Sequence, residues 1–501
     1  MASIEHISDL DTAKQVALLL EKENARLHKR IAALVRELAK AKGQDGSRQL
    51  ELELMRLQEQ AVQFQNALFG QSSERRGSPK TEPTEPAPQR GHGPRKQPEL
   101  PCVEVEHELD EADQTCPECG GQLGEWQDQY EESEEVTVVE RRFVITKHKR
   151  KKYRCRCGAC VLTAPGPLKL IEGGRYSIDF AIEVAVSKYL DHLPLERQCR
   201  IMGREGLVVD SQTLWDQIWA LSRHLEPSYL ALREELFAHD VVHADETPWP
   251  LLGSKKKKGT RKWYVWCLAA PDGVFYKVRP SRSAKAGAEV LGGFEGTAIV
   301  DGYSAYQTLA RASPDLRLAY CWAHVRRKLI KAEQFYPEEV GEAMELVGEI
   351  FDLDRSVPNP EDLEGEERQE ALALRARVRD EQVRPVMEEL RQWALRQRAL
   401  KKSSLRKAVE YMLGLWDGLV LCLDDPRIPL TNNLAERVIR GPVLGRKNHY
   451  GSKSERGTQV AAIFYSLLET AKLRGVEPKA YLAEAARAAI EEPGTVTLPG
   501  A

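Results

Sequence analysis

The sequence predicts an α/β protein in which a small sheet carries acidic residues and helical segments precede and interrupt it. Residues 241–242 and 298–300 are short apolar runs rich in β-branched residues, as in buried strands, and an aspartate follows each. A heptad repeat near the N-terminus and two C-x-x-C pairs indicate two further parts. We therefore expect a coiled coil, a cysteine module, a helical region and an α/β core, in that order.

The composition limits the function classes. Hydrophobic residues make up 42% of the 501 residues, which allows a sizeable core and several domains. The formal net charge is only -3, so contact with nucleic acid must come from local basic patches. No apolar run approaches the roughly 18 residues of a membrane span, and no signal-peptide pattern opens the chain. We expect a cytoplasmic, nucleoid-associated protein whose ten cysteines indicate metal binding rather than disulfides.

Residues 1–70 are predicted to self-associate as a coiled coil. Two heptad rows run over more than four heptads, and Asn24 lies in the first row. A polar residue at this position favours a defined register and two strands, so we expect a homodimer or a higher oligomer. The alternative is a single helix packed on its own chain. Position a contains Leu10, Ala17, Asn24, Ile31 and Leu38, and position d contains Ala13, Leu20, Leu27, Leu34 and Ala41.

Residues 71–100 are rich in proline and charge, which predicts a disordered linker before a cysteine module at 101–170. In this module Cys116 and Cys119 form one C-x-x-C pair, and Cys157 and Cys160 form another. Two such pairs can supply the four thiolates of a structural Zn²⁺ site. Cys155 offers an alternative ligand on the second side, although Cys157 and Cys160 repeat the spacing of the first pair. A redox-active pair is the other interpretation.

The densest basic run of the chain lies between the two cysteine pairs. Its central residues are Lys149, Arg150, Lys151 and Lys152. Such a run is typical of contact with DNA phosphates, which is independent of base sequence and sensitive to salt. The alternative is an exposed strand edge whose charges prevent aggregation.

Residues 171–237 are predicted to be helical. Residues 195–204, a turn at Gly206 and residues 210–221 have the pattern of two helices joined by a tight turn, with Asp210 or Ser211 as the cap of the second helix. A helix-turn-helix that reads DNA would place residues 211–213 near base edges. A helical pair that only packs the core is the alternative, because the second helix is rich in apolar residues.

Three acids suggest a divalent-metal site in a domain at 238–475. Asp245 and Asp301 follow the two strand-like runs, where a sheet would hold them rigidly at its edge, and Glu436 lies on a segment that resembles a helix start. Hard carboxylate oxygens suit Mg²⁺ or Mn²⁺, and such ions can stabilise the attacking and leaving oxygens of a phosphoryl transfer. A simple pair between Glu436 and Arg440 is the alternative.

The segments between these acids add further expectations. Two more strands, at 263–268 and 274–278, would form three antiparallel strands with the one that carries Asp245. Trp249 is either a base-stacking residue or a packed aromatic residue. The long interval from Asp301 to Glu436 predicts a helical insertion at about 325–430, broken near residues 357–360. Cys321 and His324 open it. His324 either assists at the active site or supports the structure through Cys321, and the neighbouring apolar residues favour the supporting role. Two ligands alone are too few for zinc.

Basic residues surround Glu436. We expect residues 429–433 to cap the helix of Glu436, with Leu434, Val438 and Ile439 on its inner face. The predicted phosphate-contacting residues are Arg440, Arg446 and Lys447. Residues 461–490 are predicted to form an amphipathic helix, and residues 476–501 a terminal helix and tail.

Four strings in fixed order, HADETP, VDGYSAY, CWAHVRRKL and TNNLAERVIR, closely resemble the transposases of the insertion sequence 66 family. The resemblance covers almost the whole chain. It implies a DDE transposase with a ribonuclease-H-like core, with Asp245, Asp301 and Glu436 as its metal-binding acids, and a zinc-binding module at the cysteines.

In the mechanism that the resemblance implies, Mg²⁺ ions activate water to nick DNA at the element's end, and the freed 3′-OH then attacks target DNA. Companion proteins encoded alongside are possible partners. A ribonuclease-H-like nuclease without strand transfer and a non-enzymatic DNA-binding regulator remain as alternatives.

Overall fold

The computed structural model describes residues 143–154, 161–252 and 261–500, together with single residues between 26 and 59 and Glu118. The three ranges belong to one compact unit, which excludes residues 69–141. The predicted linker, the lysine-rich segment at 255–258 and the cysteines Cys116, Cys119, Cys155, Cys157 and Cys160 lie outside the described residues. The single described positions between 26 and 59 are helical, and pairing of this segment with a second chain stays a prediction.

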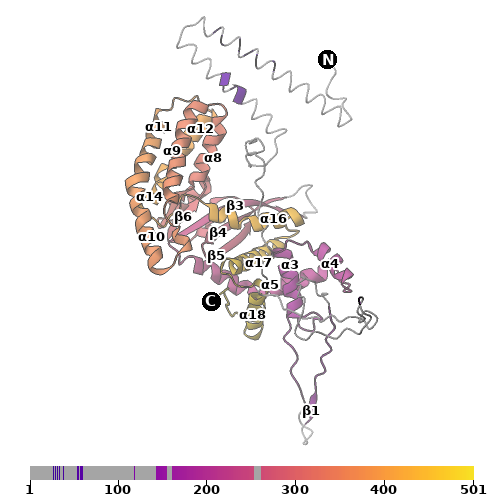
Figure 1. Cartoon of the computed structure of the whole chain (residues 1–501). Helices are drawn as coiled ribbons and strands as arrows, with labels where there is room; N and C mark the ends of the chain where they lie inside the picture. The colour runs from indigo at the N-terminus through magenta and orange to yellow at the C-terminus, as the bar shows by residue number, and fades with distance from the viewer. Residues whose placement is uncertain are drawn as a thin grey trace, which may run out of the picture. The chain divides into compact units, whose positions relative to one another are not determined.

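A five-stranded mixed sheet forms the centre of this unit (Figure 1). Its spatial order is β5-β4-β3-β6-β7. The first three strands pair antiparallel, and β3, β6 and β7 pair parallel. The three antiparallel strands predicted before Asp301 are therefore confirmed. The strands are β3 (Val241–Leu251), β4 (Arg261–Ala270), β5 (Gly273–Arg279), β6 (Gly296–Val300) and β7 (Leu316–Tyr320).

Strand β3 is longer than the sequence suggested. It pairs with β6 only over Val241, Val242 and His243 but continues along β4 as far as Leu251. The prediction that Asp245 ends its strand is wrong for this reason. Pro248 and Pro250 lie in the part of β3 that has β4 as its only pairing strand, where a residue without an N–H is tolerated.

Helix α17 (Glu455–Leu473) packs against β5, the edge strand of the sheet. Its Thr470 hydroxyl accepts a hydrogen bond from the N–H of Val274 at 3.0 Å, and its Ser466 hydroxyl accepts one from Tyr276 at 2.8 Å. Backbone donors of an edge strand are thus satisfied by side chains. Residues 460–471 are all buried, so the prediction that this segment forms an amphipathic helix is wrong. The chain turns after α17 and forms a separate helix α18 (Pro478–Glu491).

The N-terminal helical region packs on the same core. Helix α3 (Ile178–Tyr189) is followed by α4 (Leu195–Arg204), a left-handed turn at Gly206 with φ +87, and α5 (Ser211–Leu236). Asp210 caps α5 as predicted, because its side chain accepts the Thr213 N–H at 2.6 Å. The α5 residue Tyr229 stacks on Phe275 of β5, with ring centroids 4.7 Å apart. One hydrophobic cluster joins α3, α5, α17, α18 and the sheet, so much of α5 is a core helix.

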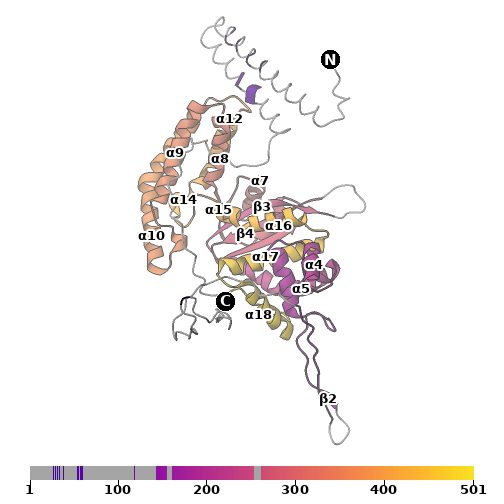
Figure 2. The same ribbon diagram turned by 45° about the vertical axis from the view of Figure 1, so that its right-hand side comes forward.

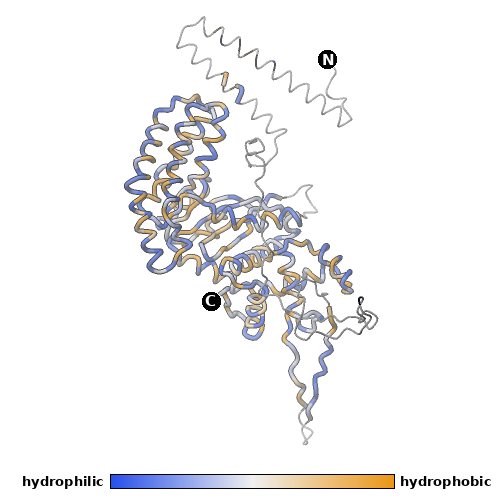
Figure 3. The backbone as a smooth tube through the Cα atoms, viewed as in Figure 1, coloured by the Kyte–Doolittle hydropathy of each residue, from blue (hydrophilic) through white to orange (hydrophobic). Residues whose placement is uncertain are grey.

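The segment predicted as a helical insertion is helical between β7 and Asp424. Its helices have a hydrophobic cluster of their own, with hydrophilic residues on the outer side of the stack (Figure 3). The predicted break lies between α9 and the short turn η2. The elements are α8 (Trp322–Glu333), α9 (Pro337–Arg355), η2 (Pro360–Asp362), α10 (Gly365–Val378), the π-helical turn η3 (Arg379–Val383), α11 (Arg384–Arg396), α12 (Ser404–Gly414), α13 (Trp416–Leu419) and α14 (Leu421–Asp424).

The remaining elements flank the sheet or precede it. Helices α6 (Ala284–Leu291) and α7 (Ser304–Ala312) contact β4, β5 and β7, and Figure 2 shows α7 on the side of the sheet away from α5 and α17. Helices α15 (Asn433–Val438) and α16 (Arg440–His449) follow the insertion and contact β3. A small antiparallel ladder joins β1 (Lys152–Arg154) to β2 (Val161–Thr163). No described helix is long and apolar enough to cross a bilayer.

Candidate functional site

Asp245 lies in β3, and Asp301 directly follows the last residue of β6, the neighbouring parallel strand. In the register of β3 and β6, His243 pairs with Ile299, and continuing this register by two residues aligns Asp245 with Asp301. Neighbouring strands lie about 4.8 Å apart, so the two carboxylates belong to adjacent points of one sheet. The two acids are aligned because each lies two residues after the last paired residue of its strand.

Local hydrogen bonds orient one oxygen of each aspartate. The Oδ1 atom of Asp245 accepts the backbone N–H of Glu246 at 2.8 Å. The Oδ1 atom of Asp301 accepts the N–H of Tyr303 at 2.9 Å, in a turn that leads into α7. Such bonds restrict the carboxylate rotamers, which is useful where oxygens must converge on a cation.

Glu436 reaches the site on the short helix α15. The predicted inner face is confirmed, because Leu434, Val438 and Ile439 are all buried. The predicted side-chain cap is wrong: Asn432 occupies the N-cap position without a capping hydrogen bond. Its amide instead donates to the Ala244 carbonyl at 2.9 Å and pairs with Nδ1 of His243 at 3.0 Å. Asn432 therefore ties the start of α15 directly to β3, one residue before Asp245.

The three carboxylates interact electrostatically at Asp245. Burial raises the pKa of Asp245 to about 7, and the negative charges of Glu246, Asp301 and Glu436 act in the same direction. A hydrogen bond from the Glu246 backbone opposes this shift. Gathered carboxylates that repel one another, with hard oxygen donors, fit a bound divalent cation, whose charge would relieve the repulsion.

A buried network lies beside these acids. Successive residues of a strand point to opposite faces, so Glu246 faces away from Asp245, toward α7. The Glu246 side chain is fully buried and accepts hydrogen bonds from the Tyr306 hydroxyl and the Arg282 guanidinium. Arg282 also lies 3.8 Å from Oδ2 of Asp301 and packs over the Tyr303 ring.

The charges of this network act on one another. Burial raises the pKa of Glu246, although its bonds to Tyr306 and Arg282 oppose the shift. Burial lowers the pKa of Arg282, but the charges of Glu246 and Asp301 outweigh it and leave that pKa above its usual value. Arg282 therefore stays a cation that connects a buried acid to the candidate metal site.

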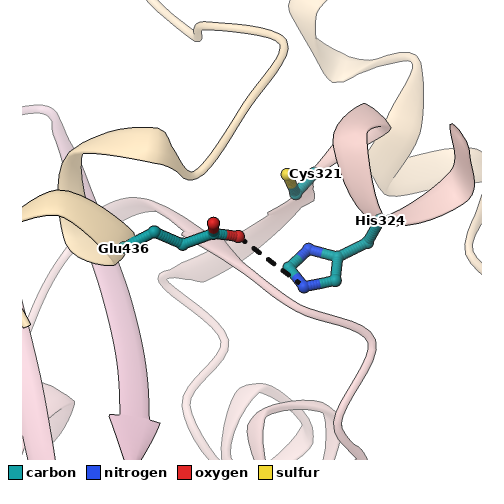
Figure 4. Close-up of side chains that lie close together, drawn as sticks. All are labelled: Cys321, His324 and Glu436. Carbon is teal, nitrogen blue, oxygen red and sulfur yellow. Dashed lines mark ion pairs between the residues drawn. The ribbon is translucent and has the colours of Figure 1, made fainter. Parts of the chain in front are cut away.

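A second group of side chains contacts Glu436 from the helical insertion. Oε1 of Glu436 lies 3.7 Å from Nε2 of His324 and 3.6 Å from Arg327, and Cys321 lies beside them (Figure 4). The Cys321 thiol accepts the backbone N–H of Asn432 at 3.2 Å. Burial raises the pKa of this thiol, and hydrogen bonds from backbone N–H groups oppose the shift. The expected structural role of this pair is supported at Cys321, which is 1% exposed.

The basic residues predicted around Glu436 differ in their surroundings. Arg440 and Lys447 are exposed. Arg446 is not, because its guanidinium donates to Thr247 and to the Pro248 carbonyl on β3, and burial lowers its pKa. Trp249 is 1% exposed and donates to the Ser452 hydroxyl at 3.1 Å, so the packed interpretation is correct and base stacking is excluded.

Comparison with known proteins assigns the family. The sequence profile described as "Transposase IS66 family" matches residues 173–460, more than half of the chain. The chain belongs to the IS66 transposase family. A second profile, described as "zinc-finger binding domain of transposase IS66", matches residues 113–158. The IS66 family membership implies that a divalent metal is bound, and the second match implies zinc.

Several proteins are similar to this chain in sequence. Uncharacterized protein y4jD of Sinorhizobium fredii (strain NBRC 101917 / NGR234) is 34% identical over 372 residues, which cover 70% of each chain. Uncharacterized protein y4hP of the same strain is 28% identical over 421 residues, 78% of this chain and 74% of that relative. Among solved structures, the Drosophila P element transposase strand transfer complex matches 65% of this chain and 83% of its own, with 10% identity and a TM-score of 0.22, too low to indicate a shared fold.

Sequence reasoning missed the residues that support the IS66 acids. Glu246 and Tyr306 stand within the family strings HADETP and VDGYSAY, but a strand pattern alone does not reveal that they meet. Arg282 stands outside every string. The one available signal was a buried acid next to Asp245, which requires a cationic partner somewhere in the chain.

Proposed function

We propose that this protein is a DDE transposase that cleaves DNA at the ends of its element and joins them to target DNA. The observation that carries the proposal is the register that aligns Asp245 of β3 with Asp301, directly after the parallel strand β6, with the charge of Glu436 acting on Asp245. The IS66 family membership supports it. A metal-dependent nuclease without strand transfer remains the second candidate, since it would use the same acids.

We also propose that the core is ribonuclease-H-like. Three antiparallel strands followed by two parallel ones, in the order β5-β4-β3-β6-β7, support this assignment. In such a sheet the acids of the two central strands lie together, and a later helix can bring the third acid from a distant part of the chain. The contacts of α15 with β3 and β4 are consistent with that arrangement.

Asp245, Asp301 and Glu436 would hold Mg²⁺ or Mn²⁺. Such ions, when bound, activate water or a 3′-OH and stabilise charge on the transferring phosphate. The chain's own residues orient these acids: Asn432 anchors the helix of Glu436, and the Tyr303 N–H orients Asp301. Arg282, which is 36% exposed, is positioned to balance charge next to Asp301.

DNA contact is assigned to exposed basic residues. Lys149, Arg150, Lys151 and Lys152 are exposed at and before β1, which supports a role in binding phosphates. Arg440 and Lys447 are the exposed candidates near Glu436. We withdraw Arg446 from this group, because its guanidinium already holds α16 to β3.

We propose self-association through residues 1–70. Ile31 and Leu38, both at predicted a positions, are 46% and 48% exposed in the single chain, which supports a partner helix at this row. Two protomers would allow two element ends to be held together. Element ends, target DNA and companion proteins encoded alongside are the partners that this role requires, in the cytoplasm at the nucleoid.

A strand-transfer assay tests the proposed activity. Purified protein, candidate element-end DNA, a supercoiled target and Mn²⁺ or Mg²⁺ should give joined products. Asp301→Asn should abolish cleavage and joining while DNA binding is retained. Asp315 is an exposed acid just before β7, and Asp315→Asn should leave cleavage and joining intact. Cleavage without joining would favour the nuclease. Element function that survives Asp301→Asn would favour a non-enzymatic regulator.

Zinc content tests the cysteine module. We propose Cys116, Cys119, Cys157 and Cys160 as ligands, but the matched zinc-finger segment ends at residue 158 and includes Cys155. Cys155→Ser and Cys160→Ser therefore separate the two ligand sets. The proposed set predicts loss of bound zinc for Cys160→Ser and retention for Cys155→Ser, and the reverse result would transfer the ligand role to Cys155.

A further inference from the structure

Three side chains with different donor atoms converge where the helical insertion meets α15. Cys321 is the N-cap residue of α8, His324 lies in the first turn of the same helix, and Glu436 is on α15. Their sulfur, nitrogen and oxygen donor atoms all lie within 4.8 Å of one another (Figure 4). Spacing alone left zinc without enough ligands at Cys321 and His324. The third ligand comes from a residue more than a hundred positions away in the sequence.

The donor set distinguishes between metals. Mg²⁺ prefers oxygen ligands, whereas Zn²⁺ and similar borderline ions accept thiolate, imidazole and carboxylate together. Ligand atoms around one tetrahedral ion lie about 3.4 to 3.7 Å apart, given metal–ligand bonds of about 2.0 to 2.3 Å. Since the donor atoms lie within 4.8 Å, binding requires them to approach by at most about 1 Å, which side-chain rotation can supply. A site with three protein ligands keeps a fourth position open to solvent.

The surroundings of the cluster are largely prearranged. Cys321 is held by the packed N-terminus of α8, and its sulfur accepts a hydrogen bond from the fully buried Asn432. A hydrogen bond of this kind stabilises a thiolate ligand. The side chains of His324 and Glu436 are 21% and 25% exposed, so an ion has access from solvent. Arg327, which pairs with Oε1 of Glu436 and is 35% exposed, can move into solvent when an ion arrives.

We propose that Cys321, His324 and Glu436 form a second metal site that takes Zn²⁺ or a similar borderline ion, and that filling it withdraws Glu436 from Mg²⁺. The site would act as an inhibitory switch, because one carboxylate is shared between two incompatible coordination sets. The binding half of the inference stands on the cluster alone. The inhibitory half rests on the proposed function.

Cobalt binding tests the site without DNA. Full-length protein is first saturated with zinc at the cysteine module and freed of excess metal, and Co²⁺ is then added. Wild type should take up one further equivalent with a cysteine-to-cobalt charge-transfer absorption. Cys321→Ser and His324→Gln should lose this absorption, and Cys422→Ser, which removes another buried thiol, should keep it. Identical spectra for wild type and Cys321→Ser would overturn the proposal.

Zinc inhibition tests the consequence. DNA cleavage in Mg²⁺ is measured against added Zn²⁺, each variant relative to its own zinc-free rate. The zinc concentration that halves the rate should rise at least tenfold in Cys321→Ser and stay unchanged in Cys422→Ser. Cobalt binding without this shift would limit the site to metal binding and refute the switch. A protein that binds cobalt as expected but cleaves no DNA would refute the proposed function instead.

Discussion

Asp245 combines burial with the charges of three neighbouring acids. Its raised pKa means that the folded chain holds this proton more tightly than the unfolded chain does. The folded state therefore loses stability as the pH rises from about 4, the ordinary pKa of an aspartate, to the folded pKa of about 7. A bound cation reverses this effect, since it stabilises the ionised carboxylates.

Asp245→Asn should make the metal-free protein more stable at pH 8, by on the order of 4 kcal/mol, because the pKa of Asp245 is raised from 3.8 to about 7 and one pKa unit corresponds to about 1.4 kcal/mol. Thermal unfolding with EDTA measures this gain. Mn²⁺ should raise the melting temperature of the wild type more at pH 8 than at pH 6, where a proton competes with the metal. The variant should lose most of the Mn²⁺ effect, and an equal Mn²⁺ effect in both proteins would contradict the assignment.

Arg282 is the residue on which the buried Glu246 depends. Arg282→Gln should lower the free energy of unfolding by about 3 kcal/mol, because it leaves a buried carboxylate without its cation. Urea denaturation measures the loss, and the double variant with Glu246→Gln should recover most of it. Arg384→Gln breaks an exposed pair with Asp380 and should cost less than about 1 kcal/mol. A loss for Arg282→Gln no larger than for this control would argue against a buried charge pair.

The sequence was sufficient to predict the three acids but not the side chains that contact them. Asp245, Asp301 and Glu436 stand in recognisable strings. Arg282 and Tyr411 do not, and their contacts with the site depend on how the chain packs.

The helical insertion contacts the acidic site where α12 packs against the turn that follows Asp301. The Tyr411 hydroxyl of α12 accepts the N–H of Gly302 at 3.2 Å, immediately after Asp301. A Cβ atom at Gly302 would lie 2.6 Å from Leu415 and Tyr411. The insertion thus contacts the backbone that orients Asp301, which requires glycine at this position.

Gly302→Ala should destabilise the protein by about 1–3 kcal/mol through overpacking. It should also weaken Mn²⁺ binding, since the clash displaces the turn that carries Asp301. Urea denaturation and Mn²⁺ titration measure the two effects. Gly341→Ala in α9 meets no atom within 4 Å and should be neutral or stabilising, because alanine favours helix. Equal behaviour of the two variants would show that the insertion does not constrain the site.

Helices with a strong periodic pattern were predicted correctly. Features that depend on contacts with a neighbouring strand were not. The helix pair at 195–221 and the insertion follow from helical patterns, and both are present. The length of β3 was missed because its apolar run at 241–242 is short, whereas its pairing with β4 continues to Leu251. The burial of α17 was missed because its Ser466 and Thr470 look polar, yet they bond to the edge of β5.

At the scale of the whole molecule, self-association is the main prediction. Leu27→Glu combined with Leu34→Glu, both at predicted d positions, should convert the protein to a monomer, because charges are costly in a coiled-coil core. Analytical ultracentrifugation measures the change in mass. Lys29→Glu, at an exposed position of the same segment, should leave the mass unchanged. A monomeric wild type would exclude the coiled coil.

The order of the parts along the chain could be read from the sequence, because heptads, cysteine pairs and acids each have a distinct pattern. The division between the helical region and the core could not. Tyr229 on one side of residue 237 packs on Phe275 on the other, so both belong to one hydrophobic core. Only contacts between distant segments reveal this.

Asp245, Asp301 and Glu436, which come from distant parts of the chain, are proposed to bind the same divalent metal. Anomalous scattering from crystals of the full chain grown with Mn²⁺ tests it most directly. We expect a manganese peak within coordination distance, about 2.0 to 2.3 Å, of carboxylate oxygens of Asp245, Asp301 and Glu436. A peak that leaves Glu436 uncoordinated, or none at these aspartates while Mn²⁺ binds elsewhere, would contradict it.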